Sequence, residues 1–506
     1  MTKHAVLLII LDGFGVNPSR AHNGWALANT PHLDHYFASN PHTLLQASGS
    51  AVGLPDGQFG NSEVGHLTLG SGRILEQDLL RINKAIHHNK LADRPVWKSL
   101  VDRNERIHLV GLVSDGGVHS HIHHLLSFLT LLVNAGITPV IHVITDGRDS
   151  PPQSAIKYVS TLERRLKELG CGEIATVCGR YFAMDRAKHW TRTENAWSAM
   201  VLGNGLHAKT ALSAIESAYA RGESDEFIQP TVVCSDAPII AKHEVVFFFN
   251  FRSDRTKQLA AAVGLNKFSK FDRNTSERPV VCLTEYQSDF TFPAIFPNQQ
   301  PKNVLADLIS KAGLRQFHCA EQEKYPHVTN FFNGGWEKPF HGEDRVIVHS
   351  KNVATYDLAP EMSAAEVADQ TIKAIESNQY DFIVVNLANA DMVGHTAVRR
   401  AIIQAVETLD LQSHRVIQAA LKHEFRILLT ADHGNCDEMV DPLTGEAHTQ
   451  HTPYPVPLLL MGEPGAKLGT DCGLSDVAPT VLNLLGLTQP SEMTGHTIIL
   501  DPHDTF

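Results

Sequence analysis

The stretch "AVLLIILDGFG" (residues 5–15) is an apolar run that ends at Asp12, next to Gly13. Two similar runs, "DFIVVNL" (381–387) and "RILLTA" (426–431), lie near the other end of the chain, and each also leads into acidic or histidine residues. Short apolar runs bounded in this way are typical of strands in a mostly parallel sheet. Because ligands bind beyond the carboxyl ends of such strands, we expect one site built from both ends of the chain.

A second group of apolar runs occupies the middle of the chain, and polar motifs such as "DGRD" and "NFRSDR" follow its members. The runs are residues 107–113, 139–145, 173–178, 244–249 and 278–283. Amphipathic stretches alternate with the runs of both groups, which predicts an α/β fold. A chain of 506 residues is too long for one ordinary core. We therefore predict a discontinuous domain of residues 1–74 plus 301–506, with a second α/β domain, 75–300, inserted into it.

Composition excludes several classes of protein. The net charge of −12 disfavours nucleic acid or an anionic membrane as a partner. The apolar run Ala5–Leu11 is too short to span a membrane, and no later run is long enough. Seven scattered cysteines without a CxxC motif argue against a disulfide framework. Together these features predict a cytoplasmic protein.

Acidic and histidine residues cluster after the strands of the first group. They are Asp12, Asp391, His395, Asp432, His433, His448 and His451. Asp391 and His395 are four apart, so a helix would place both on one face. Taken singly, an Asp-Gly pair is usually a turn and a helical histidine is usually a surface residue, but the joint pattern predicts a pair of bound metal ions. Carboxylate and imidazole ligands without thiolate suit Mn²⁺ or Zn²⁺, and also admit Mg²⁺ or Co²⁺.

Ser62 lies in "GNSEVGH" (60–66) and has two readings. Serine is a favoured helix N-cap, although Gly65 replaces the usual capping-box partner. The second glycine of the hydrolase nucleophile elbow is also missing. A metal ion bound to the hydroxyl would lower its pKa and make it a nucleophile, so a helix start and a catalytic role are compatible.

The inserted domain carries a cluster of basic residues after its strands. Its members, with one adjacent carboxylate, are His119, His121, Arg148, Asp149, Arg180, Arg186, Arg252 and Arg255. Arginine pairs bidentately with carboxylate or phosphate, which predicts an anion site. Alternatively, Arg252 and Arg255 belong to a solvated helix face, and the "HSHIHH" tract binds metal. Lys324, in "EKYPHVTNFFNGG", is a surface lysine or reaches a phosphate from near the domain junction.

Long motifs covering nearly the whole chain resemble those of the cofactor-independent phosphoglycerate mutases, of the alkaline-phosphatase-like superfamily. The motifs are "ILDGFG", "GLPDGQFGNSEVGHLTLGSGR", "SDGGVHSH", "DGRDSPP", "GRYFAMDR", "NFRSDR", "EKYPHVT", "VATYDLAPEMSA", "DMVGHT", "TADHGN" and "HTPYPVPLL". The resemblance implies a metal-bearing phosphatase-like domain built from both chain ends, with an inserted transferase domain. This is the nesting predicted from the strand runs.

The resemblance also implies roles for individual residues. Ser62 becomes the nucleophile that forms a phosphoserine, and Lys324, Asp149 and Arg255 assist catalysis. One Mn²⁺ would be held by Asp12, Ser62, Asp432 and His433, and a second by Asp391, His395 and His451. Phosphoglycerate would be bound by His119, Arg148, Asp149, Arg180, Arg186, Arg252, Arg255 and Lys324. Of the two histidines in "HTQHT", the ligand position matches His451 rather than His448.

The implied reaction is the interconversion of 3-phosphoglycerate and 2-phosphoglycerate in glycolysis and gluconeogenesis, by a monomer that needs no bisphosphoglycerate. Asp149 is the candidate general acid and base for the glycerate hydroxyls. The alternatives are a related metal-dependent phosphohydrolase or phosphopentomutase, and a non-catalytic metabolite-binding protein. The arginine-bearing insertion argues against the first, and the completeness of the ligand sets argues against the second.

Overall fold

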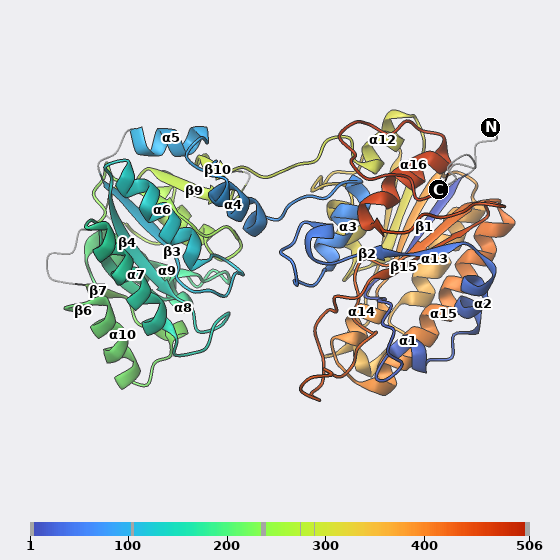
Figure 1. Ribbon diagram of the computed structural model, residues 1–506, viewed down its shortest axis with the longest axis horizontal. Helices are drawn as coiled ribbons and strands as arrows, with labels where there is room; N and C mark the ends of the chain where they lie inside the picture. The colour runs from blue at the N-terminus through green and yellow to red at the C-terminus, as the bar shows by residue number, and fades with distance from the viewer. Residues whose placement is uncertain (1–4, 103–105, 234–238, 274, 288, 501–506) are drawn as a thin grey trace. The chain divides into compact units, whose positions relative to one another are not determined.

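The computed structural model describes residues 5–102, 106–233, 239–273, 275–287 and 289–500. The chain divides into two compact units (Figure 1). Unit 1 consists of Met1–Gln77 and Gln299–Phe506, and unit 2 of Asp78–Asn298. Each unit contains one eight-stranded sheet. The predicted α/β fold class is confirmed.

The sheet of unit 1 has the strand order β12-β11-β13-β1-β14-β15-β2-β16. The strands from β12 to β14 are parallel, whereas β15 runs antiparallel to both of its neighbours. The bounds are β1 Val6–Leu11, β2 His42–Gln46, β11 Gln316–Glu321, β12 Glu343–Val348, β13 Phe382–Leu387, β14 Arg426–Thr430, β15 Val456–Met461 and β16 Cys472–Gly473. The first segment of the chain, β1, thus lies between two strands from its last quarter.

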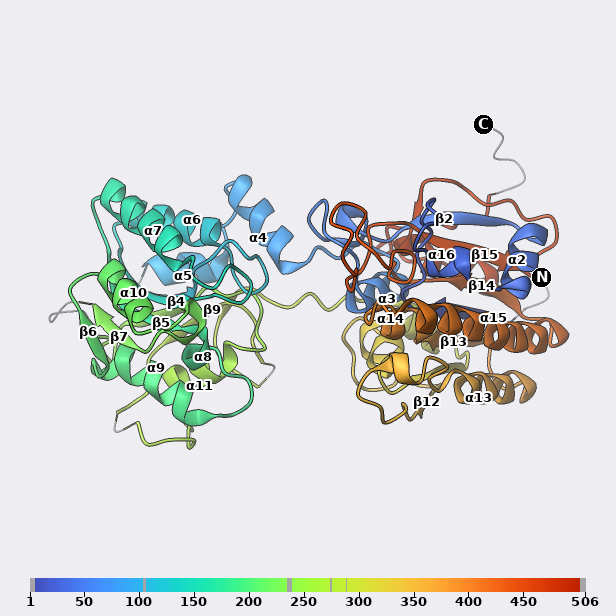
Figure 2. The same ribbon diagram turned by 90° about the horizontal axis from the view of Figure 1, so that it is seen from below.

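Helices cover both faces of this sheet. Figure 2 shows α13 and α15 side by side on one face and α16 on the other. The helices of unit 1 are α1 Gly24–Leu27, α2 Pro31–Ser39, α3 Ser62–Ser71, α12 Leu305–Lys311, α13 Ala364–Glu376, α14 Asn389–Gly394, α15 Arg399–Lys422 and α16 Val477–Leu485. Every residue of β1, β13 and β14 except Arg426 is buried, and apart from Asn386 and Thr430 the buried residues are apolar. These strands therefore read as nearly continuous apolar runs rather than as alternating ones.

A close backbone approach joins the ends of β1 and β13. Gly13 follows β1 with a φ of +76°, and a Cβ there would lie 2.6 Å from the Cα of Asp391. A larger residue would force the two strand ends apart, and its backbone would be strained at this φ. Glycine at position 13 therefore allows Asp12 and Asp391 to lie close together.

The sheet of unit 2 has the order β10-β9-β8-β3-β4-β5-β7-β6, parallel from β10 to β5. The bounds are β3 Arg106–Leu112, β4 Thr138–Thr145, β5 Glu173–Gly179, β6 Leu206–Ala208, β7 Thr231–Val233, β8 Val245–Phe248, β9 Val280–Thr284 and β10 Ala294–Phe296. Alternate residues of β3 enter different cores: Ile107 and Leu109 pack on one face, and Val110 and Leu112 on the other. The sheet is therefore buried on both sides.

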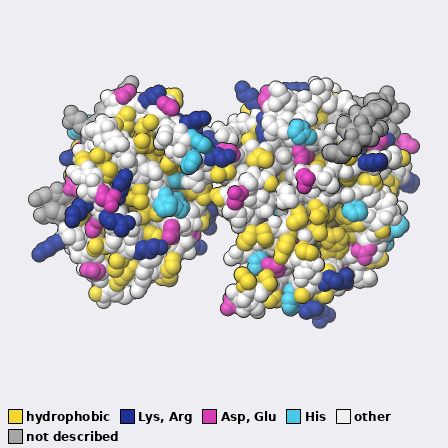
Figure 3. Space-filling view, viewed as in Figure 1, with side chains coloured by type: hydrophobic (Ala, Val, Ile, Leu, Met, Phe, Trp, Pro, Cys, Tyr) yellow, Lys and Arg dark blue, Asp and Glu magenta, His cyan; other side chains and the backbone are white. Residues whose placement is uncertain are grey.

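Helices α6, α7 and α10 pack on the first face of this sheet, and α9 and α11 on the second. The helices of unit 2 are α4 Asp78–His87, α5 Pro95–Asp102, α6 Ile122–Asn134, α7 Ala155–Leu169, α8 Arg180–Ala183, α9 Trp190–Leu202, α10 Ala211–Ala220 and α11 Lys257–Gly264. In the view of Figure 3, basic and acidic side chains are interspersed on the surface of each unit. Among the described helices, none has the length and apolar composition that a membrane crossing requires.

Candidate active site

The ends of three adjacent strands bring the acidic residues of unit 1 together. Asp12 follows β1, Asp432 and His433 follow β14, and Asp391 lies in α14, just after β13. Because these strands are parallel neighbours, their carboxyl ends lie at one edge of the sheet. Asp12, Asp432 and His433 are fully buried, and their ligating atoms lie within 4.8 Å of one another. With Ser62 they form what we call the Asp12 group.

Ser62 is the first residue of α3 and its hydroxyl reaches this group. Its Oγ lies 3.0 Å from Nε2 of His433 and donates to Oδ1 of Asp12 at 3.2 Å. The reading of Ser62 as the N-cap is wrong, because the cap is Asn61, whose side chain accepts from the N–H of Val64. Asn61 satisfies that backbone donor, so the serine hydroxyl is free to face the carboxylates.

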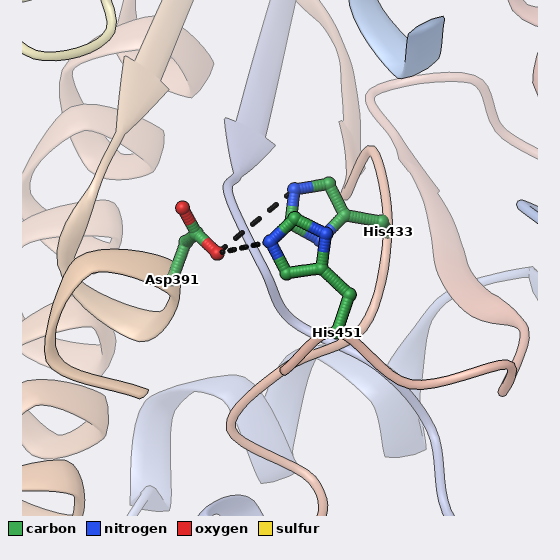
Figure 4. A group of neighbouring side chains, drawn as sticks. All are labelled: Asp391, His433 and His451. Carbon is green, nitrogen blue, oxygen red and sulfur yellow. Dashed lines mark ion pairs between the residues drawn. The ribbon is translucent and has the colours of Figure 1, made fainter. Parts of the chain in front are cut away.

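A second set of residues, the Asp391 group, consists of Asp391, His395 and His451. Oδ1 of Asp391 lies 3.2 Å from Nε2 of each histidine. Figure 4 shows Asp391 facing both His451 and His433, and the Nε2 of His433 is 4.0 Å from the same oxygen. The predicted spacing of four residues holds, since α14 places Asp391 and His395 on one face.

The hydrogen bonds of these histidines fix which ring nitrogen carries the proton. Nδ1 of His395, His433 and His451 lies 2.8–3.2 Å from a backbone carbonyl, which can only accept. In the neutral form of each ring, Nε2 therefore presents a lone pair. The Nε2 atoms of His395 and His451 are only 3.2 Å apart, and both face a carboxylate. Such converging acceptors fit a bound cation, and a backbone carbonyl on the other ring nitrogen is the usual partner of a metal-ligating histidine.

Lys324 is buried between the two groups rather than exposed on the surface. Its Nζ lies 2.6 Å from Oδ1 of Asp12, 2.5 Å from Oδ2 of Asp391 and 2.8 Å from the Ser62 hydroxyl. Burial alone would lower its pKa, but Asp12 and Asp391 raise it well above the usual range, so the ammonium is charged. One buried cation thus contacts a carboxylate from each of the two groups.

The electrostatics show an excess of negative charge. Burial and the neighbouring Asp432 raise the pKa of Asp12. Burial would also raise the pKa of Asp391, but Lys324 lowers it well below the usual range. Oδ2 of Asp432 has no hydrogen-bond partner among the described residues. An unpaired buried carboxylate oxygen is costly, and a divalent cation at this position would remove that cost.

The basic residues of unit 2 also come together, after the adjacent strands β8, β3, β4 and β5. Nη1 of Arg180 lies 2.6 Å from a carboxylate oxygen of both Asp146 and Asp149, and Nε2 of His119 lies 3.8 Å from Asp149. Burial and the positive charge of Arg180 lower the pKa of His119 to about 4. The pKa of Arg255 is lowered by burial and by the nearby charges of Arg186, Arg180 and Arg148.

Two carboxylates of this cluster, Asp146 and Asp254, were not among the site residues predicted from the sequence. Asp146 is buried and bonds the Ser114 hydroxyl at 2.6 Å as well as Arg180. Asp254 pairs with Arg186 at 3.2 Å and with Arg252 at 3.3 Å. Their signal was the position of each acidic residue inside an arginine motif, Asp146 in "DGRD" and Asp254 in "NFRSDR". Arg252 and Arg255 lie in the turn before α11, so the helix-face alternative for them is wrong.

Two histidines weighed as ligands lie outside these groups. His121 caps α6, and its ring accepts from the N–H of His123. His448 hydrogen-bonds through its backbone to Met439 and is absent from both clusters of converging ligand atoms.

Comparison with known proteins identifies the family. Residues 4–489 match the model of the Metalloenzyme superfamily. The 2,3-bisphosphoglycerate-independent phosphoglycerate mutase of Symbiobacterium thermophilum is 48% identical over 98% of both chains. The chain belongs to this mutase family. The mutase of the same name from Syntrophotalea carbinolica is 46% identical over 98% of both chains.

A solved structure agrees with this membership. The crystal structure of Leishmania mexicana phosphoglycerate mutase at low cobalt concentration is similar, with a TM-score of 0.72 and 30% identity. The match covers 99% of this chain and 98% of the other. As a phosphoglycerate mutase, the chain is an isomerase that acts on a small-molecule substrate.

Proposed function

We propose that Ser62 is the nucleophile through which the enzyme interconverts 3-phosphoglycerate and 2-phosphoglycerate. The observation that carries this proposal is the position of the Ser62 hydroxyl, within 3.2 Å of Asp12, His433 and Lys324. In the first step the bond between phosphorus and one glycerate oxygen breaks as a bond to Oγ forms. In the second step the phosphoryl group returns to the other hydroxyl, and Ser62 is restored.

We propose that two Mn²⁺ ions bind here, one at the Asp12 group and one at the Asp391 group. The converging Nε2 lone pairs and the unpaired oxygen of Asp432 support both sites. When bound, the divalent cations supply Lewis-acid charge that stabilises the phosphoryl oxygens and lowers the pKa of the Ser62 hydroxyl.

The chain itself supplies further stabilisation around Ser62. The Lys324 ammonium donates to Oγ and stays charged, so it can stabilise negative charge on the transferring group. Ser62 opens the ten-residue helix α3, whose N-terminal N–H groups and dipole favour a phosphate. The carboxylate of Asp12, which accepts from the hydroxyl, orients Oγ for attack.

We propose that unit 1 is the phosphatase-like domain and unit 2 the domain that binds phosphoglycerate. In unit 2 the arginine forks of Arg148, Arg186 and Arg252 would bind the carboxylate and phosphate of the substrate. Arg255 would stabilise the transferring phosphoryl group. Asp149 would give a proton to one glycerate hydroxyl and take a proton from the other. His119 would stay neutral at assay pH because the pKa of its buried ring is about 4.

One experiment tests the reaction. Metal-depleted enzyme is reloaded with Mn²⁺ and given 3-phosphoglycerate without bisphosphoglycerate, and the products are followed by phosphorus NMR. We expect 2-phosphoglycerate with little free phosphate. Mainly free phosphate would instead indicate a phosphohydrolase. We further propose that the enzyme is a cytoplasmic monomer, which sedimentation and cell fractionation would check.

A further inference from the structure

Two fully buried polar residues lie behind the Asp12 group and have no place among the proposed ligands. His66 is on α3, one turn after Ser62, and Asn386 is on β13. Gly65 brings this turn of α3 close to the ligand loop, since a Cβ there would lie 2.7 Å from the carbonyl oxygen of Asp432. The pair therefore sits between the nucleophile's helix and the sheet edge.

Asn386 connects Asp12 to His66. Its Nδ2 donates to Oδ2 of Asp12 at 2.7 Å and lies 3.0 Å from Nε2 of His66. A carboxylate can only accept, so the amide nitrogen must be the atom that faces Asp12. Because that nitrogen only donates, Nε2 of His66 must accept from it.

This assignment determines the rest of the network. With a lone pair on Nε2, the proton of His66 is on Nδ1, which lies 2.9 Å from the backbone carbonyl of Ser62. The same Nδ1 is 3.2 Å from Oδ2 of Asp432. Hydrogen bonds with defined donors therefore run from Asp12 through Asn386 and His66 to the Ser62 carbonyl, whereas Oδ2 of Asp432 lies beside the same ring nitrogen without accepting a hydrogen bond.

The network leaves specific oxygens for other partners. Asn386 donates to Oδ2 of Asp12, so the other carboxylate oxygen of Asp12, Oδ1, is the atom that faces Ser62 and Lys324. On Asp432, Oδ1 accepts from the N–H groups of Gly13 and His433, which leaves Oδ2 facing His66. Each carboxylate therefore has a defined orientation.

We infer that His66 and Asn386 are positioning residues, which orient the carboxylates of Asp12 and Asp432 and the backbone of Ser62 for a divalent cation at the Asp12 group. This inference rests on the proposed function, because it requires those residues to bind metal. Within the described part of the chain, the pair forms no hydrogen bond or ion pair with His395 or His451, so the Asp391 group does not depend on it. A role only in folding would weaken both sites equally.

The test is a titration of metal-depleted protein with Mn²⁺, in which free ion is measured by electron paramagnetic resonance. Asn386→Leu keeps the approximate shape and removes the amide. In this variant we expect the Mn²⁺ affinity of one of the two sites to fall by about 10–100-fold, and the affinity of the other site to stay unchanged. Asn333→Leu is the matched control, since the Asn333 amide is equally buried in unit 1 but donates to Glu343. It should leave both affinities at wild-type values.

His66 provides an independent comparison. His66→Leu should produce the same selective loss, whereas His66→Asn retains an N–H near the position of Nδ1 and should recover part of the affinity. Circular dichroism identifies folded variants, and Asn386→Ala replaces the leucine variant if the latter does not fold.

The outcomes separate the two proposals. Wild-type affinity at both sites in the folded His66→Leu and Asn386 variants, or equal loss at both sites, would overturn the positioning role. Absence of Mn²⁺ binding by the wild-type protein, or undiminished binding after Asp12→Asn, would instead overturn the proposed metal site.

Discussion

The Nζ atom of Lys324 lies 2.8 Å from the Oγ atom of Ser62, although 262 positions separate the two residues in the chain. The lysine also contacts a carboxylate from the Asp12 group and one from the Asp391 group, so one buried ammonium connects the proposed nucleophile to both. A charged donor in this position stabilises negative charge that develops on the transferring phosphoryl group.

Replacement of this lysine should mainly reduce turnover. For Lys324→Met we expect kcat to fall by about 10²–10³-fold, the usual effect of losing one preorganised donor. Lys311→Met is the control, because Lys311 is exposed and its partners among the residues that the structure describes are Asn303 and Asp307. Steady-state kinetics would measure both variants, and wild-type kcat in Lys324→Met would contradict the role given to the ammonium.

Loss of the nucleophile should abolish mutase turnover without unfolding the protein. Ser62→Ala removes only the hydroxyl, whereas the cap of α3 is provided by Asn61 and remains. Ser71→Ala, at a buried serine in the same helix, should retain activity. Mass spectrometry of acid-quenched wild-type enzyme should find phosphate on the peptide that carries Ser62. Substantial turnover in Ser62→Ala would remove this residue from the mechanism.

Metal removal should abolish activity and lower thermal stability. Without a cation, the facing lone pairs of His395 and His451 and the excess carboxylates repel one another. Mn²⁺ at about 100 times its dissociation constant should stabilise the folded state by about 2.7 kcal/mol per site. Calorimetry with and without Mn²⁺ checks this. Mg²⁺, Co²⁺ and Zn²⁺ in parallel would rank the metals, and identical transitions under all conditions would contradict metal binding.

Arg180 should contribute to both stability and substrate binding in unit 2. Arg180→Met leaves the buried Asp146 without its cation, which costs about 3–5 kcal/mol for a broken buried pair. KM for phosphoglycerate should rise as well. Arg192→Met, which breaks a more exposed pair with Asp185, should cost much less. Urea unfolding and steady-state kinetics would show the difference, and equal effects of the two variants would argue against the special position of Arg180.

Asp437 should make stability depend on pH. Burial raises its pKa to about 6, so the folded state binds this proton more tightly than the unfolded state does. Stability contributed by the protonated form is therefore lost as pH rises from about 4 through 6. Asp437→Asn, which keeps a partner for the Thr452 hydroxyl, should be more stable than wild type by about 2–3 kcal/mol at pH 7.5 and equally stable near pH 4.

The matched control for Asp437 is Asp441→Asn. Asp441 is exposed, and the backbone N–H groups of Leu443 and Thr444 lower its pKa, so this change should not stabilise the protein at neutral pH. Thermal melts across this pH range would compare the variants. A constant difference between wild type and Asp437→Asn would show that Asp437 does not titrate there.

The strands that carry the site were predictable because their composition is simple. β1, β13 and β14 are buried on both faces, so each is a mainly apolar run followed by a candidate ligand, and Asn386 and Thr430 are the only buried polar interruptions. β11 was not predicted, because its interior holds polar side chains. His318 bonds Gln316 at 3.0 Å and the Val328 carbonyl at 2.6 Å, partners that only the folded chain brings together.

The acidic residues of the two groups, with His395 and His433, were also predictable, since each follows a strand or is four residues from another candidate ligand. Ser62 and His451 follow no strand, and their assignment rests on the family resemblance. The partners behind the two groups were not predictable. Asp146 contacts Arg180 across 34 positions, and Asn386 contacts His66 and Asp12 across 320 and 374 positions, which no local spacing reveals. The burial of the Lys324 side chain was not predicted for the same reason, because a lone lysine in a loop motif carries no signal of burial.

The place of β1 between β13 and β14 has a consequence for synthesis of the chain. The ribosome produces Val6–Leu11 first and Arg426–Thr430 on the order of 20–80 s later, at about 5–20 residues per second. Unit 2, a continuous segment, is complete before either partner strand exists. During that interval the six apolar residues of β1 have no neighbouring strand with which to pair. A chain that stops before Arg426 leaves the edge of β1 that β14 would cover unpaired, and an unpaired apolar edge is prone to aggregation.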